Sequence, residues 1–453
     1  MHTLETFRAR ILVVLAPMLL VGGCHDWLSA PKAVNNPNQP TTASSDALLI
    51  GITVDQTTLQ TGDIPRALSM WTQQMAGTDR QYVGLGAYVM GEDTFGGDWT
   101  AVYTGGGLID IRQLERQTLA TGDSIYAGVA YVWEALTMGT AADLWGDIPY
   151  SEADPSHPTP KLDPQQQVYQ TVQAKLDTAI RFLACTSATC QGPAGVDLIY
   201  RGDPTRWTEA AHTLKARFYL HVAARDPSAY ALALAQTASG ISDPTHDFTT
   251  YQSNNPNERN LWFQFTVLTR NGYISGGQYL VDLLRTTTDP RLSQYFTPNS
   301  AGQFVGAPPG VGPGDWATLG GARVTPAFRQ PVITYAENAL IRAEAALRTG
   351  QQAVANAAYN AERASQGVAL KSGNVTLTDV LTEKYIALFQ QIEAWNDYKR
   401  TCLPAITPAT AAGVPRRLFY PATVERNSNP NVPAPDRQPA RNWNDPTGCP
   451  AGG

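Results

Sequence analysis

The stretch Ala141–Pro155 reads AADLWGDIPYSEADP, and it decides how the rest of the chain is interpreted. A long run of helix-forming residues leads into it. Gly146 can end that helix in a left-handed turn, and Pro149 prevents the helix from resuming. The stretch also carries four acids: Asp143, Asp147, Glu152 and Asp154. They spread over 12 positions without an accompanying histidine or nucleophile, so the stretch predicts a structural corner rather than a catalytic pair of carboxylates.

Helical patterns dominate the chain on both sides of this corner. Before it, apolar residues recur at three- and four-residue steps from Asp123 or Ser124 onward. The same spacing returns in PTRWTEAAHTLKARFYLHVAAR, which starts at Pro204. In that segment Lys215 and Arg217 fall outside the apolar stripe. These periodicities predict long amphipathic helices.

A third and a fourth helical segment follow each other almost without a break. The segment ITYAENALIRAEAALRTG ends at Gly350, a residue suited to the C′ position, and QQAVANAAYNAERASQG begins at once. Two helices joined by so short a turn must lie antiparallel, and their alanine faces allow close backbone approach. This is the helical hairpin of tetratricopeptide-type repeats, here without a clean repeat consensus. The sequence therefore predicts an all-α fold, a tetratricopeptide-like hairpin scaffold with long irregular loops and little strand.

Long irregular stretches separate the helical segments. They run over 239–277 and 297–330 and make up the tail after Thr407. Loops of this length in a compact domain are usually functional. They hold aromatic residues beside polar neighbours: Tyr251, Trp262, Phe263, Tyr273 and Trp316. We therefore look for a binding surface in these loops.

Composition excludes one class of partner. The 453 residues are 43% hydrophobic and only 16% charged, with a net charge of −6 and a pI near 5.6. The chain thus lacks the basic footprint of a protein that binds nucleic acid. Its length is sufficient for two or three domains or for one extended helical array.

The N-terminus has the order of an export signal. Arg8 and Arg10 precede an apolar run over 11–21, which is too short to span a bilayer as a helix. Two glycines and Cys24 follow. This order resembles the bacterial lipoprotein signal, in which the cysteine is lipidated and becomes the first residue. We predict a signal peptide over 1–23 and lipidation of Cys24; an ordinary cleaved signal with an incidental cysteine is the alternative.

A tether is expected to follow the lipidated cysteine. Residues 24–44 are rich in Pro, Asn, Ser and Thr, a composition typical of an extended linker. Ordered structure is expected to begin near Ser45, which stands before an apolar-periodic run.

The other four cysteines suggest two disulfide bonds. With Cys24 lipidated, an even number is left, and export permits disulfides. Cys185 and Cys190 bracket a short loop, whereas Cys402 and Cys449 would tie the C-terminal tail to the body. Closing the longer loop would contribute on the order of 4 kcal/mol by restricting the unfolded chain.

Histidine spacing speaks against a metal centre. The six histidines stand at positions 2, 25, 157, 212, 221 and 246, and the sequence has no HExxH or CxxC motif. We therefore predict neither a metal site nor a cofactor.

Five segments, taken in order, carry a family resemblance: ADLWGDIPYSEA, WTEAAHTLKARFYLH, NALIRAEAALRTG, ALFQQIEAWNDYKRT and PRRLFYPATVERNSNPN. The first resembles the helix-ending signature of the SusD/RagB-like family of outer-membrane nutrient-uptake lipoproteins, with Trp145 in place of the commoner tyrosine. The resemblance covers most of the chain, roughly from Ser45 to Asn431. Each segment is weak alone, and their common order makes the match.

The resemblance implies a fold, a location and partners. It implies one α-helical domain over 45–453, a lipid anchor in the outer membrane at the cell surface, and no catalytic activity. It also implies a SusC-like TonB-dependent barrel that the lipoprotein covers like a lid. The nutrient ligand would be a glycan or, in some members, a peptide. Under this interpretation Asp147 and Glu152 belong to the scaffold.

Recognition of a sugar requires aromatic platforms beside a few oriented polar groups. Two regions have this composition: YVMGEDTFGGDWTAVY, which contains Trp99, and NNPNERNLWFQF, which places Trp262 beside Arg259 and Asn260. Trp316 follows in a Gly/Pro-rich loop. We predict these five residues as ligand contacts. Burial in the core is the alternative for the tryptophans.

Two other functions are compatible with the sequence. An exported glycoside hydrolase would use two of Glu92, Asp93 and Asp98, whose carboxyl groups would have to lie about 5–9 Å apart across a cleft. Side chains as close in sequence as Glu92 and Asp93 need not converge in that way. A helical-repeat scaffold that binds only proteins is the other alternative. The sequence has no G-x-S-x-G elbow or P-loop for other chemistries.

Overall fold

The computed structural model describes residues 43–449. Two compact units divide the chain, Met1–Ala47 and Leu48–Gly453. In the described part of the first unit, Ser44 Oγ accepts a hydrogen bond from the backbone N–H of Ala47 at 3.2 Å. The predicted signal peptide, the lipidation of Cys24 and nearly all of the predicted tether lie outside the described residues.

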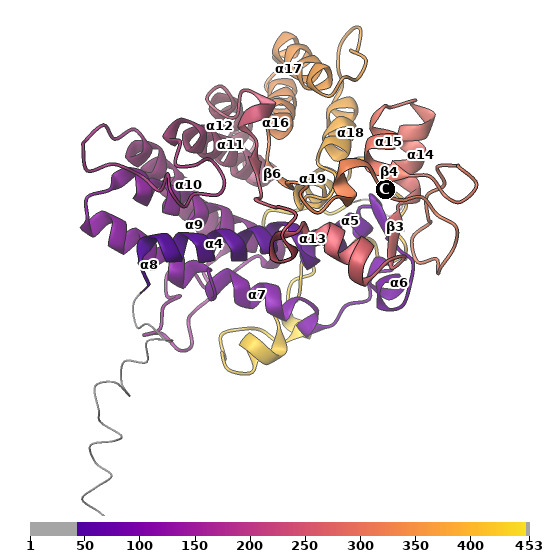
Figure 1. Cartoon of the computed structure of the whole chain (residues 1–453). Helices are drawn as coiled ribbons and strands as arrows, with labels where there is room; N and C mark the ends of the chain where they lie inside the picture. Colours follow the sequence, from indigo (N-terminus) through magenta and orange to yellow (C-terminus); the bar gives the residue numbers. More distant parts are fainter. Residues whose placement is uncertain (1–42, 450–453) are drawn as a thin grey trace, which may run out of the picture. The chain divides into compact units, whose positions relative to one another are not determined.

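The second unit is predominantly helical, and Figure 1 shows α8 to α12 on one side of it and α14 and α15 on the other. The helices are α4 (Ser45–Thr61), α5 (Asp63–Trp71), α6 (Gln81–Gly86), α7 (Gly96–Tyr103), α8 (Leu108–Ala120), α9 (Ser124–Trp145), α10 (Gln165–Leu183), α11 (Pro204–Val222), α12 (Ala229–Thr237), α13 (Leu261–Phe263), α14 (Gln278–Thr286), α15 (Arg291–Tyr295), α16 (Tyr335–Arg348), α17 (Gln352–Ser365), α18 (Leu377–Ala387) and α19 (Glu393–Thr401).

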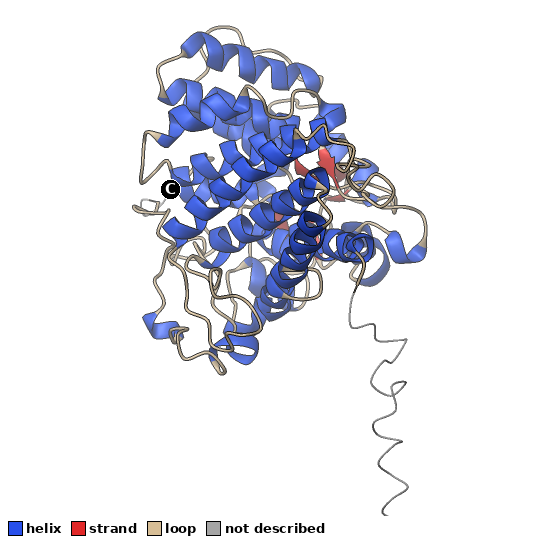
Figure 2. Cartoon of the chain, turned by 90° about the vertical axis from the view of Figure 1, so that its left-hand side faces the viewer, coloured by secondary structure: helices blue, strands red, loops and turns tan. Residues whose placement is uncertain are grey.

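Strands contribute little, as Figure 2 shows. Within residues 43–449 they form three antiparallel pairs, β1 with β3, β2 with β6 and β4 with β5. Their bounds are β1 (Met75–Gly77), β2 (Phe248–Thr249), β3 (Ile274–Gly276), β4 (Phe296–Thr297), β5 (Thr318–Leu319) and β6 (Pro331–Ile333). The all-α prediction is confirmed. Within the same range no helix is both long and apolar enough to cross a membrane.

Helix α9 is the centre of the helical body, and it packs against α8, α10 and α11. Nearly all of its side chains are buried, which explains why its sequence is apolar or small on every face. Two glycines set how closely its neighbours approach. A Cβ at Gly139 would lie 2.1 Å from Phe218 Cζ of α11, and one at Gly128 would lie 2.9 Å from Leu183 Cγ of α10. A larger residue at either position would push the helices apart.

Helices α16 and α17 form the hairpin expected from the sequence. The turn is a Schellman motif: Gly350, with a φ of 75°, donates its N–H to Leu347 O at 3.2 Å, and Gln351 donates to Ala346 O at 2.8 Å. Glycine suits the positive φ because it has no Cβ. The predicted stop at Gly350 is confirmed.

Helix α11 buries charges that its apolar stripe leaves out. Lys215 and Arg217 are only 3% and 2% exposed. Arg217 donates from Nε and Nη2 to the two carboxylate oxygens of Glu337, each at 2.6 Å, and Lys215 Nζ lies 2.5 Å from Asp177 Oδ1. The helix contacts α10, α12, α16 and α19, so no single face meets solvent. Arg217 has a buried carboxylate partner in Glu337, and Lys215 has an exposed one in Asp177.

The last part of the chain folds back over the helical body. We call residues 402–449 the C-terminal segment. The structure joins Cys402 to Cys449 and Cys185 to Cys190, the same pairs as those suggested by the sequence. Leu418 N donates to Leu144 O at 2.8 Å, which places the segment beside the end of α9.

Candidate functional site

The corner at 141–155 is held by the C-terminal segment. Gly146 has the positive φ expected from the sequence, 83°, but its ψ of −115° differs from that of a left-handed helical turn. A Cβ at this position would lie 2.7 Å from Asn442 Oδ1, so close packing as well as φ requires glycine. Trp145 is fully buried and donates from Nε1 to Phe419 O at 3.0 Å.

The acids of the corner take part in the scaffold. Asp147 Oδ1 accepts the backbone N–H of Gln165 at 2.8 Å, at the start of α10. Glu152 Oε2 accepts the backbone N–H of Lys161 at 3.0 Å. Asp154 closes a local turn by accepting the backbone N–H two residues further on, at 2.8 Å. These contacts agree with the interpretation of the stretch as a structural corner.

The fourth acid, Asp143, belongs to a buried charged triad with His221 and Glu393. His221 Nδ1 lies 2.8 Å from Asp143 Oδ1, and its Nε2 lies 2.8 Å from Glu393 Oε2. Burial alone would lower the pKa of His221, but the two carboxylates raise it to about 9. The donor atoms lie within 4.8 Å of one another, a spacing compatible with a metal ion. An imidazolium meets one carboxylate on each nitrogen, and Arg217 Nη1 lies 3.7 Å from Glu393 Oε1, so two cations already face the two carboxylates and we assign the triad to the scaffold.

The acids proposed for a hydrolase are also largely occupied. Glu92 accepts Nε and Nη2 of Arg426 at 2.6 and 3.0 Å. Asp93 accepts the backbone N–H and the hydroxyl of Thr423, both at 2.8 Å, and these hydrogen bonds lower its pKa. Burial raises the pKa of Asp98 to about 7. Two of the three acids therefore fasten the region after α6 to the C-terminal segment.

Two of the predicted platforms are buried, which corrects the expectation from the sequence. Trp99 is 2% exposed and packs edge to face on Trp145, with ring centroids 5.2 Å apart. Trp262 is 0% exposed. Neither ring can stack on a sugar in this conformation. Polar neighbours in sequence suggested exposure, but the short helix α13 turns the indole of Trp262 into the core.

The residues beside Trp262 also serve the scaffold. Asn260 is buried and caps α13, because its Oδ1 accepts the backbone N–H groups of Trp262 and Phe263 at 2.9 and 3.0 Å. Arg259 is half-buried. Of the predicted tryptophans, Trp316 alone keeps a partly exposed ring, and its Nε1 donates to Gly312 O at 3.4 Å. Arg259 and Trp316 therefore remain predicted contacts, whereas Asn260 does not face a ligand.

A cavity of about 620 Å³ beside Tyr279 has the composition expected of a sugar site. An aromatic ring, amides, a carboxylate and proline rings converge on it from four parts of the chain. We call it the Tyr279 cavity, and its lining residues are Gln73, Gln278, Tyr279, Asp282, Leu283, Thr286, Pro308, Pro309, Ala405, Thr407, Pro408 and Ala409.

The β1–β3 pair positions this lining. At the end of the pair where Met75 faces Gly276, Gly277 N donates to Gln74 O at 3.1 Å. A Cβ at Gly277 would lie 2.2 Å from Gln73 O, so only glycine allows this approach. Gln73 has a φ of 58°, and its Nε2 donates to Thr407 O at 2.5 Å, which joins the C-terminal segment to the same place.

The Tyr279 ring is half-buried and packs edge to face on Tyr385, with centroids 5.8 Å apart. Burial raises the pKa of its hydroxyl, so the group stays protonated and able to donate at neutral pH. Asp282 accepts Arg285 Nη2 at 2.9 Å, and its side chain is 39% exposed. The cavity thus offers one hydrophobic ring with donors and acceptors around it.

An aromatic cluster lies at the other end of the β1–β3 pair, where Thr78 N donates to Tyr273 O at 2.8 Å. The half-buried ring of Tyr82 lies 6.0 Å from that of Tyr273. The exposed guanidinium groups of Arg80 and Arg270 lie 5.5 and 5.4 Å from the centroid of the Tyr273 ring. Rings beside mobile donors make this cluster a second surface suited to sugars.

Sequence reasoning found Tyr273 as a loop aromatic but missed Tyr279, Gln73 and Tyr82. Tyr279 lies in a helix, where an aromatic residue reads as core. The Pro308–Pro309 pair in a Gly/Pro-rich loop was the available signal that this part of the chain is irregular. The convergence on Tyr279 has no local signature, because its parts come from positions between 73 and 409.

Comparison with known protein families identifies the family of the chain. The sequence profile described as "SusD-like_2: Starch-binding associating with outer membrane" matches residues 37–366. The chain belongs to the SusD-like family. No curated protein sequence matches this SusD-like protein.

Solved structures agree on the fold. A SusD/RagB family protein from Bacteroides thetaiotaomicron is 21% identical with a TM-score of 0.74, over 90% of this SusD-like chain and 100% of that one. A chitin-binding SusD homologue from Flavobacterium johnsoniae is 20% identical with a TM-score of 0.70, over 89% and 98%. The family resemblance and the tetratricopeptide-like fold predicted from the sequence are confirmed.

Proposed function

We propose that this SusD-like protein binds a glycan in the Tyr279 cavity and delivers it to a SusC-like TonB-dependent barrel without altering it. The observation that carries the proposal is the convergence of Tyr279, Gln73, Gln278 and Asp282 on one open cavity. A half-buried ring can stack on the apolar face of a sugar, and the exposed amide of Gln278 and the carboxylate of Asp282 can bond its hydroxyls. Two of the similar solved structures are described as chitin-binding, which makes a chito-oligosaccharide the first ligand to try.

Calorimetric titration of the protein with N-acetylchitohexaose tests the proposal. We expect saturable binding, and we expect Tyr279→Ala to weaken it about tenfold through loss of the stacking ring. Tyr251→Ala is a matched control, because this exposed tyrosine lies outside the cavity lining. Equal affinities of the two variants would contradict the assignment of the site.

The non-catalytic part of the proposal has its own test. Prolonged incubation of the protein with the same hexasaccharide should release no new reducing ends. Turnover that Asp98→Asn abolishes would support the hydrolase alternative instead, since the pKa of Asp98 is raised towards that of a general acid. Binding of a peptide library without binding of any saccharide would favour a peptide-binding member of the family.

The anchor and the partner complete the proposal. A single domain over 45–453 would hang from lipidated Cys24 by the tether and sit on the barrel at the cell surface. In the native host, the wild-type chain should fractionate with the outer membrane and co-purify with a TonB-dependent barrel, whereas Cys24→Ser should be lost from the membrane fraction. Cys24→Ser retained there would contradict the lipid anchor.

A further inference from the structure

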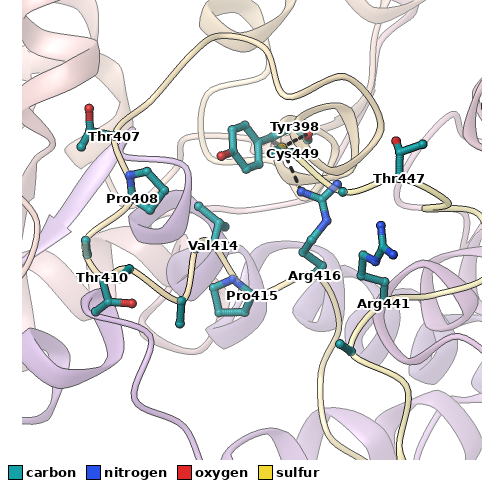
Figure 3. A pocket seen from close by; sticks show the side chains of 16 residues that line it. Tyr398, Thr407, Pro408, Thr410, Val414, Pro415, Arg416, Arg441, Thr447 and Cys449 are labelled. Carbon is teal, nitrogen blue, oxygen red and sulfur yellow. Dashed lines mark hydrogen bonds between the residues drawn. The ribbon is translucent and has the colours of Figure 1, made fainter. Parts of the chain in front are cut away.

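A second cavity, of about 810 Å³, opens between two stretches of the C-terminal segment. We call it the C-terminal cavity. Figure 3 shows Arg416 and Arg441 entering it from neighbouring stretches, with both guanidinium groups directed to the side of Thr447. The lining is Tyr398, Thr407 to Arg416, Ala440, Arg441 and Thr447 to Cys449.

The charge of this lining is one-sided. It contains two arginines and no aspartate or glutamate. Arg416 is held by the scaffold, because Nη2 donates to Asp445 Oδ1 at 2.9 Å and Nη1 donates to Cys449 Sγ at 3.0 Å. Its positive charge is therefore already balanced by a carboxylate behind the cavity.

Arg441 differs from its neighbour. Its side chain is half-buried, and among residues 43–449 its guanidinium group has neither an ion-pair partner nor a hydrogen-bond acceptor. It packs against Gly448, where a Cβ would come within 3.0 Å of Nη1. A guanidinium group has five N–H donors in a fixed fork that matches a carboxylate. A half-buried, unbalanced arginine in an open cavity thus indicates an acidic ligand group.

The hydroxyl groups of the lining extend this chemistry. Thr407, Thr410 and Thr447 are exposed on the cavity wall, as Figure 3 shows. Such hydroxyls can donate to a second carboxylate oxygen or to neighbouring sugar hydroxyls. The only aromatic residue of the lining, Tyr398, is buried, so the cavity recognises a polar group rather than the face of a ring.

The two cavities are continuous along the chain. Thr407, Pro408 and Ala409 line both the Tyr279 cavity and the C-terminal cavity. The two cavities therefore share one stretch of wall.

We propose that the C-terminal cavity binds the carboxylate of a uronic acid residue, with Arg441 as the residue that selects acidic over neutral glycans. The inference rests on the proposed glycan-binding function and specifies its substrate class.

The test compares two ligands that differ only at the carboxyl groups, a charged galacturonic acid hexamer and its uncharged, fully methyl-esterified form. We expect the mature chain to bind the acid at least about tenfold more tightly than the ester, and the difference to shrink as salt screens the charge. Arg441→Gln should abolish the difference without lowering the melting temperature. Arg437→Gln is the matched control: it makes the same charge change on an exposed residue of the same segment, outside the lining, and should keep the difference.

Several results would overturn the inference. They are equal affinity for acid and ester, an unchanged difference in Arg441→Gln, and loss of thermal stability in Arg441→Gln in place of loss of selectivity. Binding of N-acetylchitohexaose without any binding of the uronate hexamer would overturn the inference and leave the proposed function standing. Binding of neither saccharide would overturn the proposed function as well. Arg441-dependent binding of a peptide with a free C-terminal carboxylate, with no uronate binding, would reassign the cavity to peptides.

Discussion

The corner at 141–155 and the Tyr279 cavity are made of the same kinds of residue, yet they do different things. In the corner, the ring of Trp145 is fully buried, and Asp147 accepts a backbone N–H at the start of a helix. In the cavity, the ring of Tyr279 is half-buried, and the side chain of Asp282 is 39% exposed. An aromatic residue therefore indicates a binding site where part of its ring faces a cavity, as with Tyr279, and not where the ring is fully buried, as with Trp145.

The contrast between Trp262 and Tyr279 sharpens this point. Trp262 lies in a polar, irregular stretch and is 0% exposed, whereas Tyr279 lies in a helix and faces a cavity. Polarity of the neighbours in sequence was thus a poor guide to exposure, because burial is decided by residues far away along the chain.

The largest expected effect on stability comes from replacing Trp262, which we assign to the scaffold. Trp262→Ala should lower the free energy of unfolding by about 4 kcal/mol, because it empties a fully buried volume. It should leave saccharide affinity per folded molecule unchanged. Urea denaturation and calorimetry measure the two effects. Trp316→Ala is the comparison, and it should destabilise the protein less because the ring is half-buried. The assignment of Trp262 to the core would fail if Trp262→Ala weakened saccharide binding and left stability unchanged.

The C-terminal segment contributes to both regions, and one disulfide joins its two ends. Replacing Cys402 and Cys449 by serine should lower the free energy of unfolding by about 4 kcal/mol, since the bond closes a loop of 47 residues in the unfolded chain. The matched pair Cys185 and Cys190 closes only 5 residues, and its replacement should cost about 2 kcal/mol. Chemical denaturation of the oxidised proteins compares them, and equal losses would argue against the loop-closure explanation.

The charged triad behind the corner predicts a dependence of stability on pH. The folded pKa of His221, about 9, lies above its ordinary value of 6.5, so the folded state binds this proton more tightly. The charged His221 therefore contributes its full share to the free energy of unfolding below pH 6.5. This contribution, on the order of 3 kcal/mol, is lost as the pH rises to about 9.

Denaturation of wild type and His221→Gln across this pH range tests the effect. The difference in unfolding free energy should shrink as pH rises. Burial lowers the pKa of Lys399 to about 8, so Lys399 also titrates in this range. It is present in both proteins, so its effect largely cancels in the difference between their unfolding free energies. A difference that stayed constant with pH would mean that His221 is not charged in the folded state.

The smallest expected effect compares two aspartates directly. Asp147→Ala should lower the free energy of unfolding by about 1 kcal/mol, because α10 loses the acceptor at its first turn. Asp282→Ala should change stability little, since its exposed pair with Arg285 contributes weakly, and should reduce saccharide affinity. Thermal melts and titrations of both variants suffice. The reverse pattern would place the ligand at the corner.

Local sequence was sufficient for much of the fold. Gly350 follows the end of α16 as expected, and Asp147 and Glu152 make the scaffold contacts that the sequence predicts. Local sequence did not predict that the charged residues of α11 are buried, because Arg217 pairs with Glu337, which lies 120 positions further along the chain. Nor did it find the cavity, whose lining spans Gln73 to Ala409.

Four of the helices, the hairpin turn between α16 and α17, the corner and the family follow from the sequence alone. These follow from residues within a few positions of one another, where backbone preferences and helical periodicity act. The three-dimensional packing is needed to see which rings are buried, which charges are balanced and which four parts of the chain enclose the Tyr279 cavity. Burial and charge balance are properties of neighbours in space, and in this chain those neighbours lie up to several hundred residues apart.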